Sequence, residues 1–514
     1  MNRGKKDYTA YLSSVIICVL FTIWGAIPGS LLGKYSMSHV AEVLQTFISK
    51  EFGWLYVLLM VVILIAAVYL LFSKYGNIKL GRQDDKPEFS YFSWVAMLFS
   101  AGMGIGLIFW GVAEPVMHLH DPAIPSSDKL ANARESMTYT FFHWGLQPWA
   151  LYALIGLIIA YTTFRKDKPA IISESVTPLF AKRYRGTIGT IVDTIAIIAT
   201  VFGVATSLGL GAQQIAGGLS FSISWIPNTF AVQLAVIITV TVLYLISATT
   251  GLDKGVKILS NVNIALAVLL MLAVLFIGPT AYLLDLFVQS VGNYFQKLPG
   301  MSFRLAAFSP ENRQWIDKWT IFYWSWWISW APYVSSFIAR ISKGRTIREF
   351  VGGVLIVPTV FTFLWFSVFG GTGIWQELFN NNNLIQVITE KGTETGLFAM
   401  LESYGSIGKV ITGIAILLIS TFFITSADSA TYVLAMFSTN GNLTPHARVK
   451  LLWGVIMSSI AAILLYAGGL ESLQAVAVLG SFPFLFVVIL MSINFFKWLG
   501  EEKSVTGKKL SKEK

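Results

Sequence analysis

Long apolar segments recur along the whole chain, and they restrict its fold more strongly than any single motif does. A helix that crosses the hydrocarbon core of a bilayer needs about 20 mostly apolar residues. Twelve stretches meet this requirement, called spans 1 to 12 below: 11–32, 54–73, 92–116, 137–163, 188–217, 230–249, 258–280, 316–340, 350–374, 407–437, 449–468 and 472–498. We therefore predict an all-α integral membrane protein with twelve transmembrane helices. The amphipathic segment Tyr282–Gln296 is too short to cross, and we expect it to lie at the membrane surface.

Charged residues are too scarce to cover a water-facing surface. They make up 12% of the 514 residues, about half of what a soluble domain carries. In a soluble protein the net charge of +10 would suggest nucleic acid or acidic partners, but here most lysines and arginines lie in short segments such as 74–91 and 164–187. That bias indicates a multi-pass protein of a bacterial-type cell membrane with both chain ends cytoplasmic. We expect a lipid bilayer, and no nucleic acid, as its surroundings.

Several functional classes are disfavoured by what the chain contains. A single cysteine is too little for a disulfide framework or a metal cluster, and no nucleotide-binding loop is present. We therefore expect no cofactor and no ATP-driven pump, so any energy the protein uses would come from an ion gradient. The five histidines are scattered, and only His118 and His120 are close, at a span end. No catalytic pair is apparent within the spans, which disfavours an intramembrane enzyme.

Span 3 contains three alternating glycines, Gly102, Gly104 and Gly106. A glycine pair spaced by four is typical of close packing between two membrane helices. Three glycines in five residues go further, because each costs about 1 kcal/mol of helix stability relative to alanine. Unwound backbone at membrane depth is tolerated where it lines a cavity, and its freed carbonyls would suit a cation. We expect Glu114 and Pro115 to end this span near the outer face.

Span 8 concentrates tryptophan at membrane depth. It contains Trp319, Trp324, Trp326, Trp327 and Trp330. An interfacial aromatic belt is the ordinary explanation for such residues, and Trp319 fits it. The run continues to Tyr333, roughly 16–21 Å along the helix, which is too deep for one headgroup layer. Pro332 removes a backbone hydrogen bond in mid-span, so we expect a kink or break there.

A second aromatic group lies in span 4, where Trp144, Trp149 and Tyr152 follow one another closely, with Pro148 expected to distort the turn. Taken alone, such residues more often belong to a packed core than to a binding site. Together with span 8 they predict a cage of aromatic faces, which attracts a trimethylammonium group that cannot donate hydrogen bonds. Acidic groups in the spans are few, and none is an obvious counter-ion. We therefore expect a zwitterion that carries its own carboxylate.

Span 10 places hydroxyls in an apolar helix: Thr421, Thr425, Ser426 and Ser429. Such hydroxyls commonly bond to the carbonyl four residues earlier or pack between helices. Facing unwound carbonyls, they would instead offer the hard oxygen ligands that sodium needs. Both interpretations stay open on the residues alone.

These motifs together resemble one family. The strings GMGIG and GVAEP in span 3, HWGLQPWALY in span 4, FYWSWWISWAPYV and FIARIS in span 8 and TSADSAT in span 10 are similar to those of the betaine/choline/carnitine transporters, over about residues 10–500. The resemblance implies inverted repeats of the leucine-transporter type, formed by spans 3–7 and 8–12, with spans 1 and 2 peripheral. The implied division is 1–10 cytoplasmic head, 11–73 peripheral spans, 92–280 first repeat, 281–315 interfacial helix and outer loop, 316–498 second repeat and 499–514 basic cytoplasmic tail.

The resemblance also implies a site. The aromatic box of the family falls on Trp144, Trp149, Tyr152 and Trp327, and the same pathway is lined by Trp324, Trp326, Trp330 and the glycines Gly102, Gly104 and Gly106. The sodium site of the family falls on the carbonyls of Ser100, Met103 and Phe422 and the hydroxyls of Thr425 and Ser426. At a second sodium position of some members Thr200 is present, but Val204 stands where a hydroxyl is needed. A homotrimer is a family expectation.

Gly106 bears on the choice of substrate. Members that take up choline often carry aspartate at this position, whereas glycine resembles the betaine-specific members. We therefore expect sodium-coupled import of glycine betaine, with proline betaine, carnitine and ectoine left open. A proton-coupled or exchange carrier of choline or carnitine is the alternative within transport, and a channel or osmosensor is the alternative outside it.

Overall fold

The computed structural model describes residues 8–502 except 103 and 251–252, and side chains outside 99–103 and 249–257. Its main elements are helices, joined by short 3-10 turns, and the described residues form no strand beyond one isolated bridge between Lys79 and Thr346. The helices are α1 (Thr9–Ala26), α2 (Gly29–Leu32), α3 (Met37–Phe72), α4 (Tyr91–Gly102), α5 (Ile105–His120), α6 (Lys129–Trp144), α7 (Leu146–Ala160), α8 (Arg185–Ser222), α9 (Phe230–Thr250), α10 (Asp253–Ile277), α11 (Thr280–Ser302), α12 (Pro310–Ile316), α13 (Phe322–Arg340), α14 (Ile347–Phe379), α15 (Leu384–Lys391), α16 (Gly396–Glu402), α17 (Gly405–Ser438) and α18 (Ala447–Gly500).

The all-helical prediction is confirmed for the described part of the chain, where nine helices are long and apolar enough to cross a membrane. The predicted total of twelve differs for identifiable reasons. Span 3 is divided between α4 and α5, and α13, with its many tryptophan, tyrosine and serine residues, is not among those nine helices. Spans 11 and 12 are joined in α18. The count of twelve and the inverted repeat stay predictions.

Several helix ends differ from those expected. Span 1 stops at Ala26 and is followed by the four-residue α2, whereas α3 starts at Met37, well before the predicted residue 54. Within α18, Gly469 has φ 60° and ψ −132°, a conformation that glycine adopts without steric cost. The chain therefore bends between predicted spans 11 and 12.

The helices are not interrupted at the two prolines where we expected it. The helix α13 runs through Pro332 without a break, and the irregular segment is instead a π-helical turn at Asp317–Ile321, just before it. In span 4 the helix is interrupted at Gly145, not at Pro148. A proline in the first turn of a helix costs no hydrogen bond, and Pro148 lies in the first turn of α7.

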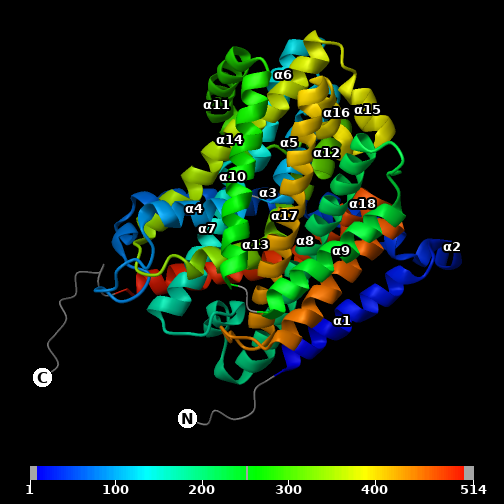
Figure 1. Cartoon of the computed structure of the whole chain (residues 1–514). Coiled ribbons are helices and arrows are strands. Elements are labelled where there is room, and N and C mark those ends of the chain that lie inside the picture. The colour runs from blue at the N-terminus through cyan, green and yellow to red at the C-terminus, as the bar shows by residue number, and fades with distance from the viewer. Residues whose placement is uncertain (1–7, 103, 251–252, 503–514) are drawn as a thin grey trace, which may run out of the picture.

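Helix α13 lies at the centre of the bundle. It packs against α7, α8 and α18, and its residues from Phe322 to Ser336 are all buried. Helix α1, in contrast, buries only Ser14, Cys18 and Gly25 and lies at the edge of the bundle beside α8 and α18 (Figure 1). A helix buried on every side is typical of the core of a large helical protein.

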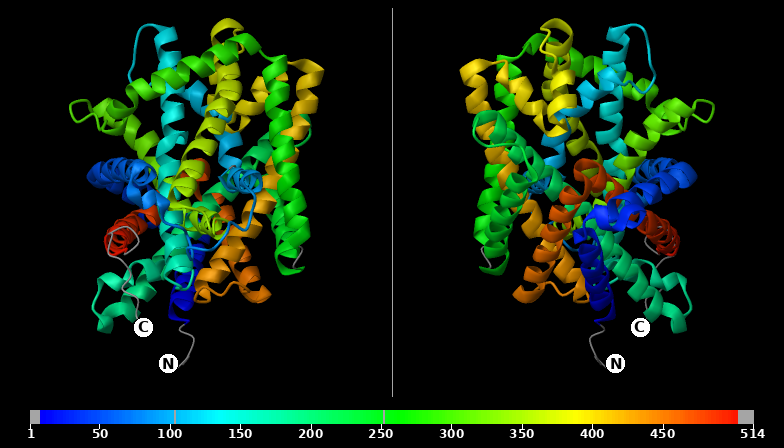
Figure 2. Two further views of the ribbon diagram at one scale, coloured as in Figure 1. Left: turned by 90° about the vertical axis from the view of Figure 1, so that its left-hand side faces the viewer. Right: turned by 90° about the vertical axis from the view of Figure 1, so that its right-hand side faces the viewer.

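Helix α11 contains the amphipathic segment that we expect at the membrane surface. It spans Thr280–Ser302 and packs against α6 and α14. Figure 2 shows it running across one end of the bundle, crosswise to α10. It therefore caps that end of the helices that carry the candidate site.

Candidate functional site

The glycines of span 3 create the space that the tryptophans of span 8 occupy. Helix α4 ends at Gly102 and α5 begins at Ile105, with Gly104 in extended conformation, so the predicted interruption of this span is confirmed. A Cβ atom on Gly104 would lie 3.1 Å from Cη2 of Trp330, and one on Gly106 would overlap the ring of Trp326. Both glycines are therefore needed for close packing against α13.

The four residues expected to form the aromatic box lie together. The rings of Trp144 and Trp327 meet edge to face, with centroids 4.8 Å apart. Tyr152 lies 6.3 Å from Trp327 and 5.6 Å from Trp149, again edge to face in both pairs. The indole nitrogen of Trp327 donates a 3.0 Å hydrogen bond to the carbonyl of His143, which holds its ring in this orientation.

The three further tryptophans of α13 divide into two groups. Trp326 stacks on Trp327 at 5.0 Å with an interplanar angle of 14°, and Trp330 lies beside Trp326 with its indole nitrogen bonded to the carbonyl of Gly203. The ring of Trp324 instead lies against Phe142, 5.1 Å away. The structure thus places Trp326 and Trp330 along the box, whereas Trp324 packs on its far side.

Two buried hydrogen-bond donors at the box have no partner within the described part of the chain. They are the hydroxyl of Tyr152 and the indole nitrogen of Trp326. Leaving a buried donor unsatisfied costs about 1–3 kcal/mol. Both residues belong to the aromatic cluster, so a ligand that presents a hydrogen-bond acceptor there would satisfy them.

The interruption at Gly145 determines where Trp144 lies. Trp144 is the last residue of α6, and Gly145 takes φ −92° and ψ −133° before α7 begins. A Cβ atom at this position would lie 2.5 Å from the carbonyl oxygen of Phe141. Glycine is therefore required here, and it allows Trp144 to point towards α5 and α13.

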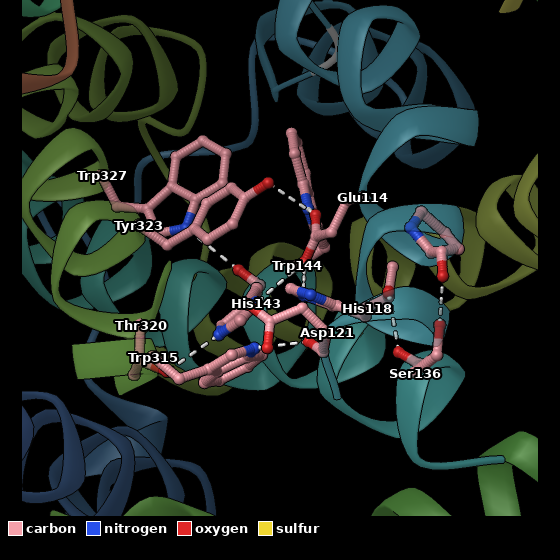
Figure 3. A network of polar contacts seen from close by, with 12 residues as sticks. Glu114, His118, Asp121, Ser136, His143, Trp144, Trp315, Thr320, Tyr323 and Trp327 are labelled. Carbon is pink, nitrogen blue, oxygen red and sulfur yellow. Dashed lines mark hydrogen bonds and ion pairs between the residues drawn. The ribbon is translucent and has the colours of Figure 1, made fainter. Parts of the chain in front are cut away.

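The carboxylate of Glu114 contacts the box through Trp144. Trp144 Nε1 donates a 2.6 Å hydrogen bond, and the hydroxyl of Tyr323 a 2.5 Å hydrogen bond, to Oε2 of Glu114. On the other side His143 Nδ1 lies 2.8 Å and His118 Nε2 3.2 Å from Oε1. Figure 3 shows the four side chains converging on this one group.

This cluster corrects the expectations for span 3 and for the histidines. Helix α5 does not end at Glu114 but continues to His120, and the Glu114 side chain is fully buried. His118 and His143, far apart in the chain, both contact it. The available signal was Glu114 itself, because an ionisable residue inside a span is rare unless it has a role.

The same three side chains have the composition of a metal site. One ligand atom from each of Glu114, His118 and His143 lies within 4.8 Å of the others. Those atoms are already joined by hydrogen bonds, and the remaining His143 nitrogen bonds to Thr320. Apart from Nδ1 of His118, which has no partner in the described part of the chain, the polar groups are therefore satisfied by one another without an ion.

The proposed sodium residues are only partly described. Met103 lies outside the described residues, and the side chain of Ser100 does too. In α17 the hydroxyl of Thr425 donates to the carbonyls of Thr421 and Phe422 and accepts from Asn263. This is the helix back-bonding left open above, and it leaves sodium binding there as a prediction.

Comparison with known proteins decides the family. The family model described as "BCCT, betaine/carnitine/choline family transporter" matches residues 9–504. The chain belongs to this transporter family. As a family member it is a multi-pass membrane transporter and not an enzyme.

Individual members of the transporter family match over nearly their whole length. The chain is 48% identical over 494 residues to the glycine betaine transporter OpuD of Bacillus subtilis (strain 168), covering 96% of this chain and 95% of that one. It is 40% identical over 510 residues to an ectoine/hydroxyectoine transporter of Virgibacillus pantothenticus, covering 98% and 99%. A probable glycine betaine transporter of Desulfitobacterium hafniense (strain Y51) is 40% identical over 507 residues, covering 97% and 99%.

Proposed function

We propose that this transporter imports glycine betaine together with sodium by alternating access. The observation that carries the proposal is the convergence of the Trp144, Tyr152 and Trp327 rings in a buried cluster. Aromatic faces attract a methylated cation by about 0.5–2 kcal/mol each, most strongly where water is excluded. The quaternary end of the substrate would lie against these three rings.

The carboxylate end of a betaine suits the polar groups of the same cluster. The buried Tyr152 hydroxyl and Trp326 indole nitrogen are both donors, and a carboxylate is an acceptor for each. Gly106 offers no carboxylate to choline, which carries none of its own, and a larger side chain there would meet the Trp326 ring. The relatives named as glycine betaine transporters support glycine betaine as the substrate. The relative named as an ectoine/hydroxyectoine transporter makes ectoine the second candidate.

Sodium coupling is supported by the interruption of span 3 and by the hydroxyls of α17. The interruption at Gly104 lies between α4 and α5, and unwound backbone of this kind can supply carbonyl ligands at membrane depth. Thr425 and Ser426 provide the hydroxyls. Basic residues concentrated in alternate loops support chain ends on the cytoplasmic side.

Uptake into proteoliposomes tests the proposal. Radiolabelled glycine betaine, ectoine, choline and carnitine would each be offered with and without an inward sodium gradient. We expect glycine betaine to accumulate only with the gradient. Uptake of choline alone would contradict the substrate assignment, and betaine uptake that ignores sodium would contradict the coupling.

A further inference from the structure

The acidic side chain of Glu114 contacts the aromatic box through Trp144, and its surroundings identify its charge state. It accepts hydrogen bonds from the Trp144 indole and the Tyr323 phenol, which act here as donors, at 2.6 and 2.5 Å. Short bonds of this kind are typical of a charged acceptor. One oxygen is fully engaged by these two groups.

The two histidines complete the pattern when both are neutral. His118 then donates from Nε2 and His143 from Nδ1 to the second oxygen of Glu114. The bare Nε2 of His143 accepts from the hydroxyl of Thr320 at 3.0 Å, and the bare Nδ1 of His118 has no partner in the described part of the chain. A carboxylate offers about four acceptor positions, so the ionised form of Glu114 is satisfied without a bound proton.

The charge on this carboxylate is not neutralised locally. Within the described residues, Glu114 forms ion-pair contacts only with His118 and His143, and no lysine or arginine lies within ion-pair distance. A buried carboxylate without a cationic partner makes its surroundings strongly attractive to a cation. With both histidines neutral, the site therefore carries one net negative charge, which a cationic ligand would offset.

The hydrogen bonds connect this charge to the rings of the box. Trp144 lies 4.8 Å from Trp327, and Tyr323 stacks against Trp327 at 6.0 Å. An N–H or O–H that donates to an anion polarises its ring and makes the ring face more negative, which strengthens attraction to a cation over that face. Trp144 and Tyr323, the two aromatic donors to Glu114, are therefore both ring neighbours of Trp327.

We propose that Glu114 is the buried counter-charge for the quaternary ammonium of the substrate, acting through the Trp144 and Tyr323 rings. This inference rests on the proposed function and makes Glu114 a positioning and specificity-determining residue. Because protein donors occupy all of its acceptor positions, the carboxylate attracts a cation without offering it a ligand oxygen. Sodium or lysine gains little from such a charge, whereas a methylated cation needs no ligand oxygen.

The test compares two ligands of one shape. Glycine betaine and 3,3-dimethylbutanoate differ in that the quaternary nitrogen is replaced by carbon, which removes the positive charge. Binding to the purified full chain would be followed by tryptophan fluorescence. For Glu114→Gln we expect the Kd of glycine betaine to rise about tenfold, while that of 3,3-dimethylbutanoate stays the same or falls. Glu114→Asp, which keeps the charge, should retain the wild-type ratio of the two Kd values.

A matched control is Glu394→Gln, since Glu394 is also a buried glutamate, bonded to Asn228 away from the box. It should leave both Kd values unchanged. If Glu114→Gln raised the Kd of both ligands equally, the inference would be overturned. That result would show that the variant changed the shape of the binding site and not its charge. A wild-type chain that binds no quaternary ammonium would overturn the proposed function as well, so the two failures are distinct.

If Glu114→Gln does not fold, the wild-type chain labelled with ¹³C-glutamate tests the same point. The infrared difference spectrum on binding glycine betaine should show a shifted band of an ionised carboxylate. A band from a protonated carboxylic acid, or no glutamate band at all, would overturn the inference.

Discussion

A Cβ atom on Gly106 would lie 2.4 Å from Cη2 of Trp326, closer than two side chains can pack. This contact joins the interrupted span 3 to the central helix α13. It makes the proposed substrate site sensitive to a single methyl group on α5.

The first prediction is therefore that Gly106→Ala weakens transport. Overpacking of a filled interior costs about 1–3 kcal/mol, and here the cost falls on the Trp326 ring beside Trp327. We expect KM for glycine betaine uptake to rise by about tenfold. Gly413→Ala in α17 is the control, since its Cβ would meet no atom within 4 Å. An equal KM in the two variants would show that the contact is unimportant.

The second prediction concerns the wall of the box. Trp327→Ala removes the ring that contacts both Trp144 and Tyr152, and we expect betaine affinity to fall by at least about tenfold, as expected for loss of a cation–π partner in a dry site. Trp327→Phe should retain part of the affinity. Trp225→Ala, an exposed tryptophan, should have no effect on Kd measured by equilibrium dialysis.

The third prediction concerns the ion site. Thr425→Ala and Ser426→Ala should each raise the sodium concentration that gives half-maximal betaine uptake by about tenfold, because each removes a proposed oxygen ligand, and a tenfold change corresponds to about 1.4 kcal/mol. Ser420→Ala is a matched control, since Ser420 lies in the same helix and donates only to the carbonyl of Ile416. Unchanged sodium dependence in both variants would show that the ion site does not include Thr425 and Ser426.

The fourth prediction concerns the end of α18. Arg165 bonds to both carboxylate oxygens of Glu502, and Tyr161 donates to one of them. The hydrogen bond from Arg165 lowers the pKa of Glu502 to about 2, against an opposing effect of burial. A lowered pKa means that the contact stabilises the folded state above the ordinary glutamate pKa and is lost as the pH falls towards 2.

We therefore expect hydrogen exchange at residues 498–502 to stay slow from about pH 8 to about pH 5, after correction for the intrinsic rate. Arg165→Gln should raise this exchange at every pH in that range. Arg183→Gln, which removes an arginine that stacks on Tyr184 instead, should leave it unchanged. A wild-type chain that loses protection near pH 5 would contradict the assignment.

Much of the site could be predicted because its residues stand out within short segments of single helices. The glycines around Gly104 and the tryptophans around Trp327 are unusual for any membrane helix, and the resemblance to a known family placed Trp144 and Tyr152 beside them. Trp324 shows the limit of this reasoning. It belongs to the same motif, but its ring turns to Phe142, because at 100° per residue its side chain leaves the helix about 160° away from that of Trp326.

The sequence by itself determined the helical membrane fold, the interruption near Gly104 and the aromatic residues available for a cation, because hydropathy and glycine content act over a few adjacent residues. Only the tertiary structure decided that Glu114 is buried against His118 and His143, that the break in span 4 falls at Gly145, and that α13 continues through Pro332. These features depend on which helices pack together. The hydrogen bonds of Glu114 come from residues up to 209 positions away in the chain, a separation over which local sequence patterns carry no information.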